Sequence, residues 1–207
     1  MCEYRDIVEH KPRLAEDLYA LLVDQDPHQE FYDVVFLVKK KGAQDEKDAI
    51  YAHTTILAAR SPALRAMFTV DTLPRPYFVI LLHQELGLEN VEKEDVMEFL
   101  KFLYTDNVDL NMENVINVMK LAIRFQIESL QAICEHTILS QLSLKNCASF
   151  LHIADAHNLE AVKSAILMYI RANIKLLLHT PEFKALTRVV RASQQLLDDL
   201  LLYILCD

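Results

Sequence analysis

Histidine and cysteine are the residues in this sequence best suited to metal binding or catalysis. The chain holds eight histidines and four cysteines, and none of the histidines lies in the zinc pattern H-E-x-x-H. His152 and His157 are five residues apart on a predicted helix, a spacing that does not place both side chains on one helical face. His136 follows Cys134 by two residues, which is equally unsuited to chelation within a helix. The spacing therefore predicts no metal site.

The glycines and cysteines argue against two further kinds of site, a phosphate-binding loop and a cysteine-based metal or redox site. The chain has only two glycines, Gly42 and Gly87, whereas a phosphate-binding loop needs several at close spacing. No two cysteines form a C-x-x-C pair, and Cys134 and Cys147 fall on apolar faces of predicted helices. We expect these two to be buried free thiols. With no catalytic motif in the sequence, we expect a protein that is not an enzyme and needs no cofactor.

Charge excludes another class of partner. The formal net charge is −9, and nucleic-acid binding depends on lysine and arginine that neutralise phosphates. The lysine run at 39–41 is followed at once by acidic residues, so we expect a solvated loop rather than a binding patch. No apolar run approaches the ~20 residues that span a bilayer. We expect no nucleic-acid or membrane partner, and an intracellular protein, cytoplasmic, nuclear or both.

One histidine occupies a defined place, in the segment "AHTTILAARSPALRAMF" at 52–68. His53 lies where a predicted strand meets a short helix, and its ring is expected to bond the open backbone groups of the helix start. Such a histidine is structural rather than catalytic. Arg60 is expected to interact with carbonyls at the end of that helix. Ser61, followed by proline, suits the N-cap of the next helix.

The first half of the chain mixes helices with strands. The leucines at 14, 18, 21 and 22 follow helical spacing and predict an amphipathic helix over 12–24. Apolar, β-branched runs predict strands at 31–38, 48–53 and 77–82. The third run is apolar throughout, which favours a central place in the sheet. Further helices are predicted at 54–60, 62–68 and 94–104.

From residue 111 onward the pattern is helical. Helices are predicted at 112–125, 129–140, 144–156, 159–171, 181–190 and 193–205. Residues 118–138 align without gaps on 150–170, an offset of 32 that matches Ala122 with Ala154. The match indicates stacked helical hairpins or a coincidence of pattern. The apolar segment "QLLDDLLLYIL" is either the last core helix or a contact with a further domain.

The ordered pieces of residues 12–140 resemble the BTB (also called POZ) domain family. They are "DVVFLV", the segment at 52–68, "FVILL", "FLKFLYTDNVDL" and "VMKLAIRFQIESLQAICEHTI". The signature residues include Asp33, His53, Arg60 and Ser61. Residues 143–207 resemble part of a BACK domain, the helical extension that often follows BTB. The expected fold class is α+β: a BTB/POZ fold, with a short mixed sheet flanked by helices, followed by an all-helical BACK-like extension.

The resemblance implies a non-enzymatic protein-interaction module. BTB domains commonly homodimerise, and the matching positions here are Leu14, Leu18, Leu21, Leu22, Ile56 and Leu57. Many BTB–BACK proteins are substrate adaptors of cullin-3 ubiquitin ligases, with the substrate held by parts outside this chain. The matching cullin-contact positions are Phe68, Val70, Asp71, Leu73, Arg75 and Tyr104.

The sequence departs from the family pattern at two places. Cullin-binding members often carry a hydrophobic-x-Glu motif after the 62–68 helix, and "FTVDTLPRPY" contains no glutamate. A self-association scaffold that does not bind cullin-3 is therefore the alternative function. Many members also follow the histidine with Lys or Arg, which faces the strand aspartate, and Thr54 stands there instead. The groove with which transcriptional members recruit corepressor peptides is expected to be altered.

Overall fold

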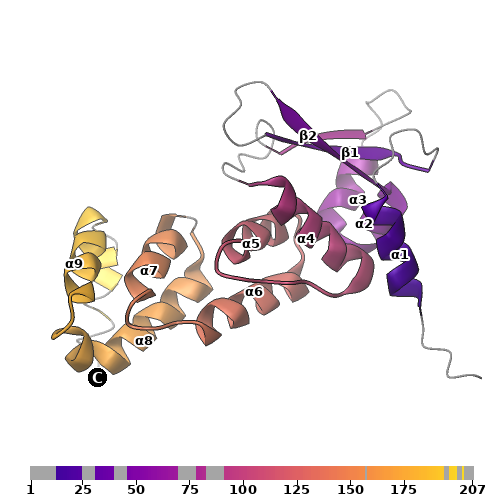
Figure 1. Cartoon of the computed structure of the whole chain (residues 1–207). Helices are drawn as coiled ribbons and strands as arrows, with labels where there is room; N and C mark the ends of the chain where they lie inside the picture. Colours follow the sequence, from indigo (N-terminus) through magenta and orange to yellow (C-terminus); the bar gives the residue numbers. More distant parts are fainter. Residues whose placement is uncertain are drawn as a thin grey trace, which may run out of the picture. The chain divides into compact units, whose positions relative to one another are not determined.

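A computed structural model describes residues 13–24, 31–39, 46–69, 78–82, 91–156, 158–193, 196–199 and 202 (Figure 1). The chain divides into two compact units, residues 1–131 and 132–207. The described part of the first unit contains a sheet and helices, and that of the second contains helices alone. The division between the two units, after residue 131, falls inside a helix that spans residues 128–140. It does not test the predicted boundary between the domains 12–140 and 143–207, which stays a prediction.

The first unit is built on a three-stranded mixed sheet. Strand β1 (Val34–Lys39) pairs antiparallel with β2 (Lys47–Ala52) and parallel with β3 (Phe78–Leu81), in the order β2-β1-β3. Side chains alternate between the faces, so that Phe36 and Ile50, opposite each other in the register, are both buried.

The prediction that 77–82 forms the central strand is wrong. β1 is central among the described strands, and β3 pairs with β1 alone. Val79 on β3 is exposed, although it belongs to the apolar run. An apolar run shows that a strand is mostly buried, but the number of neighbouring strands depends on the chain that folds around it.

Helices of the first unit cover one face of this sheet, and Figure 1 shows α2 and α3 beneath the strands. The helices are α1 (Leu14–Val23), α2 (Thr54–Arg60), α3 (Pro62–Thr69), α4 (Lys93–Thr105) and α5 (Val115–Arg124). Aromatic rings join sheet and helices in the core. The Phe125 ring centroid lies 6.4 Å from that of Phe36 on β1 and 5.3 Å from that of Phe99 on α4.

The remaining helices are α6 (Glu128–Ser140), α7 (Cys147–Ala156), α8 (Glu160–Leu177) and α9 (Glu182–Ala192). Apart from small shifts at their ends and the longer α8, they match the predicted helices. Of the predicted helix 193–205 the structure describes 193, 196–199 and 202, and 196–199 are helical. Within the described part of the chain, none of the helices combines the length and apolar character that crossing a membrane requires.

The internal echo corresponds to a repeated turn. Gln126 and Asn158, 32 positions apart, have φ values of 57° and 54°, in the left-handed region. In each copy the following residue donates its backbone N–H to the carbonyl of the matching alanine. The distance is 2.8 Å from Ile127 to Ala122 and 2.8 Å from Leu159 to Ala154. The same turn thus joins α5 to α6 and α7 to α8.

The repeat also includes the start of each hairpin. The Asn114 side-chain oxygen accepts the backbone N–H of Asn111 at 2.8 Å, and that of Asn146 accepts the N–H of Ser143 at 2.7 Å. The amide nitrogens of the two asparagines bond the carbonyls of Asp109 and Gln141 at 2.9 and 2.8 Å. These pairs share the offset of 32, so the echo is a structural repeat of helical hairpins and not a coincidence of pattern.

Candidate interaction site

His53 sits at the junction of β2 and α2, and its partner is Tyr104 of α4. The Tyr104 hydroxyl oxygen accepts the backbone N–H of His53 at 3.0 Å and lies 2.8 Å from Nδ1 of the same residue. The backbone N–H can only donate, so the hydroxyl proton is available for Nδ1. This arrangement fits a neutral imidazole that carries its proton on Nε2.

The electrostatics agree with a structural histidine. Burial lowers the pKa of His53, and the negative charge of Asp33 opposes this shift only in part. Burial likewise raises the pKa of Tyr104, so its hydroxyl keeps its proton. The location of His53 at a strand-to-helix junction is confirmed. The predicted bond of its ring to the helix-start backbone is wrong, because the ring bonds the tyrosine hydroxyl.

The start of α2 is capped by Asp33 instead. One carboxylate oxygen accepts the Thr54 backbone N–H at 2.6 Å, and the other accepts the Thr54 hydroxyl. An aspartate placed just before a strand carries no local signal for this role, since it lies 21 residues from the helix that it caps. Asp33 thus faces a neutral threonine where many family members have a cation.

Ser61 forms the predicted N-cap of α3 and also bonds a backbone carbonyl at the end of α5. Its Oγ accepts the backbone N–H of Leu64 at 3.0 Å and donates to the carbonyl of Phe125 at 2.6 Å. The residue is fully buried. The N-cap prediction is confirmed, and the second bond ties α3 to the end of α5.

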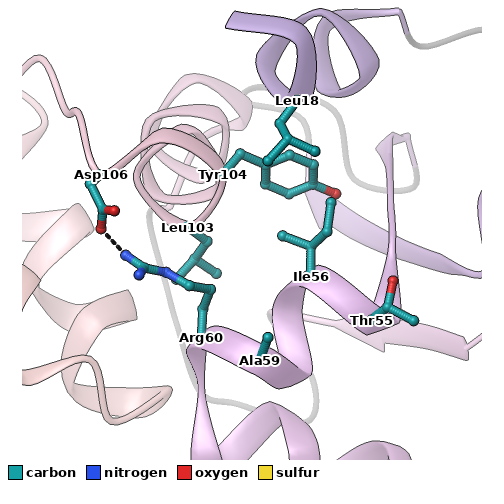
Figure 2. Close-up of a pocket in the computed structure, with 8 residues that line it drawn as sticks. All are labelled: Leu18, Thr55, Ile56, Ala59, Arg60, Leu103, Tyr104 and Asp106. Carbon is teal, nitrogen blue, oxygen red and sulfur yellow. Dashed lines mark hydrogen bonds and ion pairs between the residues drawn. The ribbon is translucent and has the colours of Figure 1, made fainter. Parts of the chain in front are cut away.

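A groove of about 320 Å³ opens beside this junction, between α1, α2 and the end of α4 (Figure 2). Its walls and floor are mostly apolar, and Figure 2 shows Leu18 of α1 facing Ile56 of α2 across Tyr104. The lining residues are Leu18, Thr55, Ile56, Ala59, Arg60, Leu103, Tyr104 and Asp106. Such a concave apolar surface is suited to receive apolar side chains of a protein partner.

One end of the groove is charged. The Arg60 guanidinium forms an ion pair with the carboxylate of Asp106 and lies 5.8 Å from the centroid of the Phe102 ring. Asp106 follows the last residue of α4 in a left-handed conformation, with φ at 60°. Instead of bonding carbonyls at its own helix end, as predicted, Arg60 joins the ends of α2 and α4.

The α1 leucines divide between two directions. Leu22 is 0% exposed and packs in the core, whereas Leu14 and Leu21 are 68% and 42% exposed. Leu18 lies between these extremes and lines the groove. On α2, Ile56 lines the groove and Leu57 is buried. Of the six predicted interface residues, four therefore face the surface or the groove, and the interface itself stays a prediction.

The predicted cullin-contact residues are only partly described. Phe68 is half-buried on α3, and Tyr104 is buried with its hydroxyl engaged by His53. Val70, Asp71, Leu73 and Arg75 lie outside the described residues. A cullin surface at these positions stays a prediction.

The two helical cysteines behave as ordinary core residues. Cys134 and Cys147 are buried free thiols, as expected, and burial raises the pKa of both, to about 12 for Cys134. Within the described ranges, no group of three or more His, Cys, Asp or Glu side chains is arranged to hold a metal ion.

Comparison with known proteins identifies the family of residues 22–142. The family model of the BTB/POZ domain matches residues 22–142. Kelch-like protein 13 of Homo sapiens is 30% identical over 139 residues, which are 67% of this chain and 20% of that protein. Kelch-like protein 8 of Caenorhabditis elegans is 27% identical over 138 residues, or 67% of this chain and 19% of that protein.

A relative whose name is not Kelch-like also matches this chain. TD and POZ domain-containing protein 5 of Mus musculus is 29% identical over 137 residues, 65% of this chain and 38% of that protein. The chain spans about a fifth of the Kelch-like relatives, 19% and 20% of their lengths. The family match ends at residue 142, so the BACK-like character of 143–207 stays a prediction. Because the match covers more than half of the 207 residues, the chain belongs to the BTB/POZ domain family.

Proposed function

We propose that this chain is a non-enzymatic, homodimeric interaction module of an intracellular protein. In this role it joins a cullin-3 ubiquitin ligase to substrates that other parts of the protein bind. The observation that supports a dimer is that α1 contributes both exposed leucines and one wall of an apolar groove. Leu14 and Leu21 project from α1, and Leu18 of the same helix lines the groove.

Such a surface is self-complementary. A two-fold axis beside α1 lets the exposed leucines of each copy enter the groove of the other, which is the isologous arrangement of most dimers. Each exposed leucine then loses contact with water, and burial of apolar surface contributes about 25 cal/mol per Å². A stable dimer requires roughly 800 Å² buried on each partner, so surfaces around the groove must also take part.

The molar mass in solution tests the dimer. We expect the wild-type chain to run as a dimer in sedimentation velocity and Leu14→Glu with Leu21→Glu to run as a monomer, because a charge in an apolar interface loses its hydration. Ile123→Glu is the matched control, since Ile123 on α5 has the same 42% exposure as Leu21. A wild-type monomer at high concentration, or a dimer that persists in the double variant, contradicts the proposal.

The adaptor role is supported by the BTB/POZ family match and by the 30% identity to Kelch-like protein 13. Isothermal titration calorimetry with the N-terminal region of cullin-3 tests it directly. We expect binding at tens of micromolar or tighter, weakened by Phe68→Ala and unchanged in Leu14→Ala, whose side chain lies on another helix. No binding at that concentration contradicts the adaptor role.

A second candidate is a scaffold that self-associates without cullin-3. It is favoured by "TVDTLPRP", where the glutamate of the hydrophobic-x-Glu motif is absent. A dimer in sedimentation velocity that gives no heat with cullin-3 is the result expected of a scaffold. Binding to cullin-3 rules this candidate out.

A further inference from the structure

The charged end of the groove differs from the rest of its lining. Arg60 is the one cation among the described residues that line the groove, and its carboxylate partner Asp106 is largely exposed. An exposed ion pair contributes little to stability because water screens it and competes for both charges. The guanidinium has five N–H donors in a planar fork, so it can bind a second carboxylate without leaving the first.

The exposed side of α1 carries an acid beside its exposed leucines. Asp17 lies three residues after Leu14 and four before Leu21, so it borders the stripe formed by these two exposed leucines. The Asp17 carboxylate is exposed, and no hydrogen bond or ion pair of this side chain occurs with any described residue. When the leucine stripe of one copy enters the groove of another, the Asp17 carboxylate therefore comes close to that groove.

We propose that Arg60 selects a second copy of this chain by binding Asp17 of the partner subunit. This inference rests on the proposed homodimer and adds the residues that decide which chain is accepted. When the leucines fill the groove they displace water from its rim, and the attraction between the two charges strengthens as the local dielectric constant falls. A related chain with a neutral or basic residue at this place on its first helix lacks the contact and is disfavoured.

The two-fold symmetry allows a sharp test by charge exchange. Each dimer contains the Arg60–Asp17 contact twice, once in each direction. Homodimers of Arg60→Glu place two acids together at both contacts, and homodimers of Asp17→Arg place two cations together. A mixture of the two variants forms a heterodimer in which both contacts join opposite charges, one of them in reversed polarity.

Sedimentation and native mass spectrometry measure the outcome. We expect each variant alone to dissociate at least about tenfold more readily than wild type, and the mixed pair to recover most of the wild-type affinity. The effect of each single variant should shrink as salt is added. Circular dichroism of each variant checks the fold, and an unfolded variant is replaced by Arg60→Gln or Asp17→Asn, with a smaller loss expected.

Two controls separate this contact from other effects of charge. Lys47→Glu changes the net charge as Arg60→Glu does, on an exposed position of β2, and should leave dimerisation unchanged. Asp106→Ala frees Arg60 from its neighbour and should weaken dimerisation far less than Arg60→Glu does. A loss in Asp106→Ala as large as in Arg60→Glu overturns the proposal, because Arg60 would then act only within its own chain.

The failures of the two proposals are distinguishable. A wild-type monomer removes the homodimer and this inference together. A wild-type dimer whose Arg60→Glu and Asp17→Arg variants associate normally, or whose folded variants dissociate and do not pair in the mixture, overturns the selection by Arg60 and leaves the homodimer standing.

Discussion

The ammonium of Lys163 on α8 lies 3.1 Å from Oδ2 of Asp199 in the second unit. Glu160 lies 3.0 Å and Asp155 of α7 3.8 Å from the same ammonium, whose side chain is 4% exposed. The same Asp199 oxygen is buried and faces the ammonium as an ion pair. One buried cation thus links α7, α8 and residues 196–199.

Replacement of Lys163 tests this link. Lys163→Ala leaves a cavity and removes the cation that pairs with Asp199. Because a buried charge is then left unpaired, we expect the free energy of unfolding to fall by about 3–5 kcal/mol. Lys163→Met fills most of the space and should cost less. Urea unfolding monitored by circular dichroism measures both changes. Equal and negligible losses in the two variants would show that the buried charge does not hold these elements together.

The same cluster predicts a dependence on alkaline pH. Burial alone would lower the pKa of Lys163, but Glu160 and Asp199 outweigh it and raise the pKa above its usual 10.5. The folded state therefore holds this proton more tightly than the unfolded state does. The resulting stability is fully present below pH 10.5 and is lost as the pH rises through the higher folded value. We expect the unfolding free energy of wild type to fall toward that of Lys163→Met over this range.

His53 predicts a dependence in the opposite direction. Its pKa is lowered below 6.5 by burial, so the unfolded state binds a proton that the folded state resists. The contribution of His53 to stability should be constant above pH 6.5, and stability should fall as the pH drops from there toward the folded pKa. NMR titration of the His53 ring measures that pKa directly. A value at or above 6.5 contradicts the buried neutral ring.

Tyr104→Phe removes the hydroxyl that receives the His53 backbone N–H. We expect a loss of about 1–3 kcal/mol, because a partly buried donor is left without its partner. Thermal unfolding measures the change, and Tyr19→Phe on α1 is the control, since Tyr19 contributes its ring to Lys101 rather than its hydroxyl. A loss no larger than that of the control would mean that water replaces the hydroxyl.

Asp33→Ala removes both bonds to Thr54 and so uncaps α2. The expected cost is about 1–2 kcal/mol, the range measured for loss of an N-cap side chain. Thr54→Val removes the hydroxyl bond and keeps the backbone bond, so it should cost less. In a double-mutant cycle between these positions, the double variant should lose less stability than the sum of the two single losses. Additive losses would show that Asp33 and Thr54 act independently.

The repeated turn predicts a gain in stability. Gln126→Gly should stabilise the chain by up to about 1 kcal/mol, because glycine adopts a positive φ without steric cost. Asn158→Gly should gain less, since asparagine already tolerates this conformation. Glu135→Gly within α6 serves as the control and should lose about 1 kcal/mol. Loss of stability in Gln126→Gly would contradict the left-handed conformation at that position.

Local pattern by itself determined most of the helices and strands of this chain. The spacing of Leu14, Leu18, Leu21 and Leu22 predicted α1, and Ser61 followed by proline marked the start of α3. The offset of 32 between helical segments pointed to the repeated hairpin before its turn was visible. These features follow from short-range periodicity and capping, which residues a few positions apart decide between themselves.

The sequence motifs, which occur in the same order as in BTB/POZ domains, also indicated this family. The family match over residues 22–142 confirms that prediction. The composition also argued against two kinds of site. Two glycines are too few for a phosphate-binding loop, and the histidines are not spaced as metal ligands. None of these observations placed an individual contact in the candidate site.

Only the tertiary structure decided which distant residues meet. His53 binds Tyr104 across 51 positions, and Arg60 reaches Asp106 across 46. The place of β3 beside β1, and the groove between α1, α2 and α4, likewise depend on how the elements pack. Such contacts are selected by the shape and burial of the whole unit, for which the sequence around each residue holds no local signal.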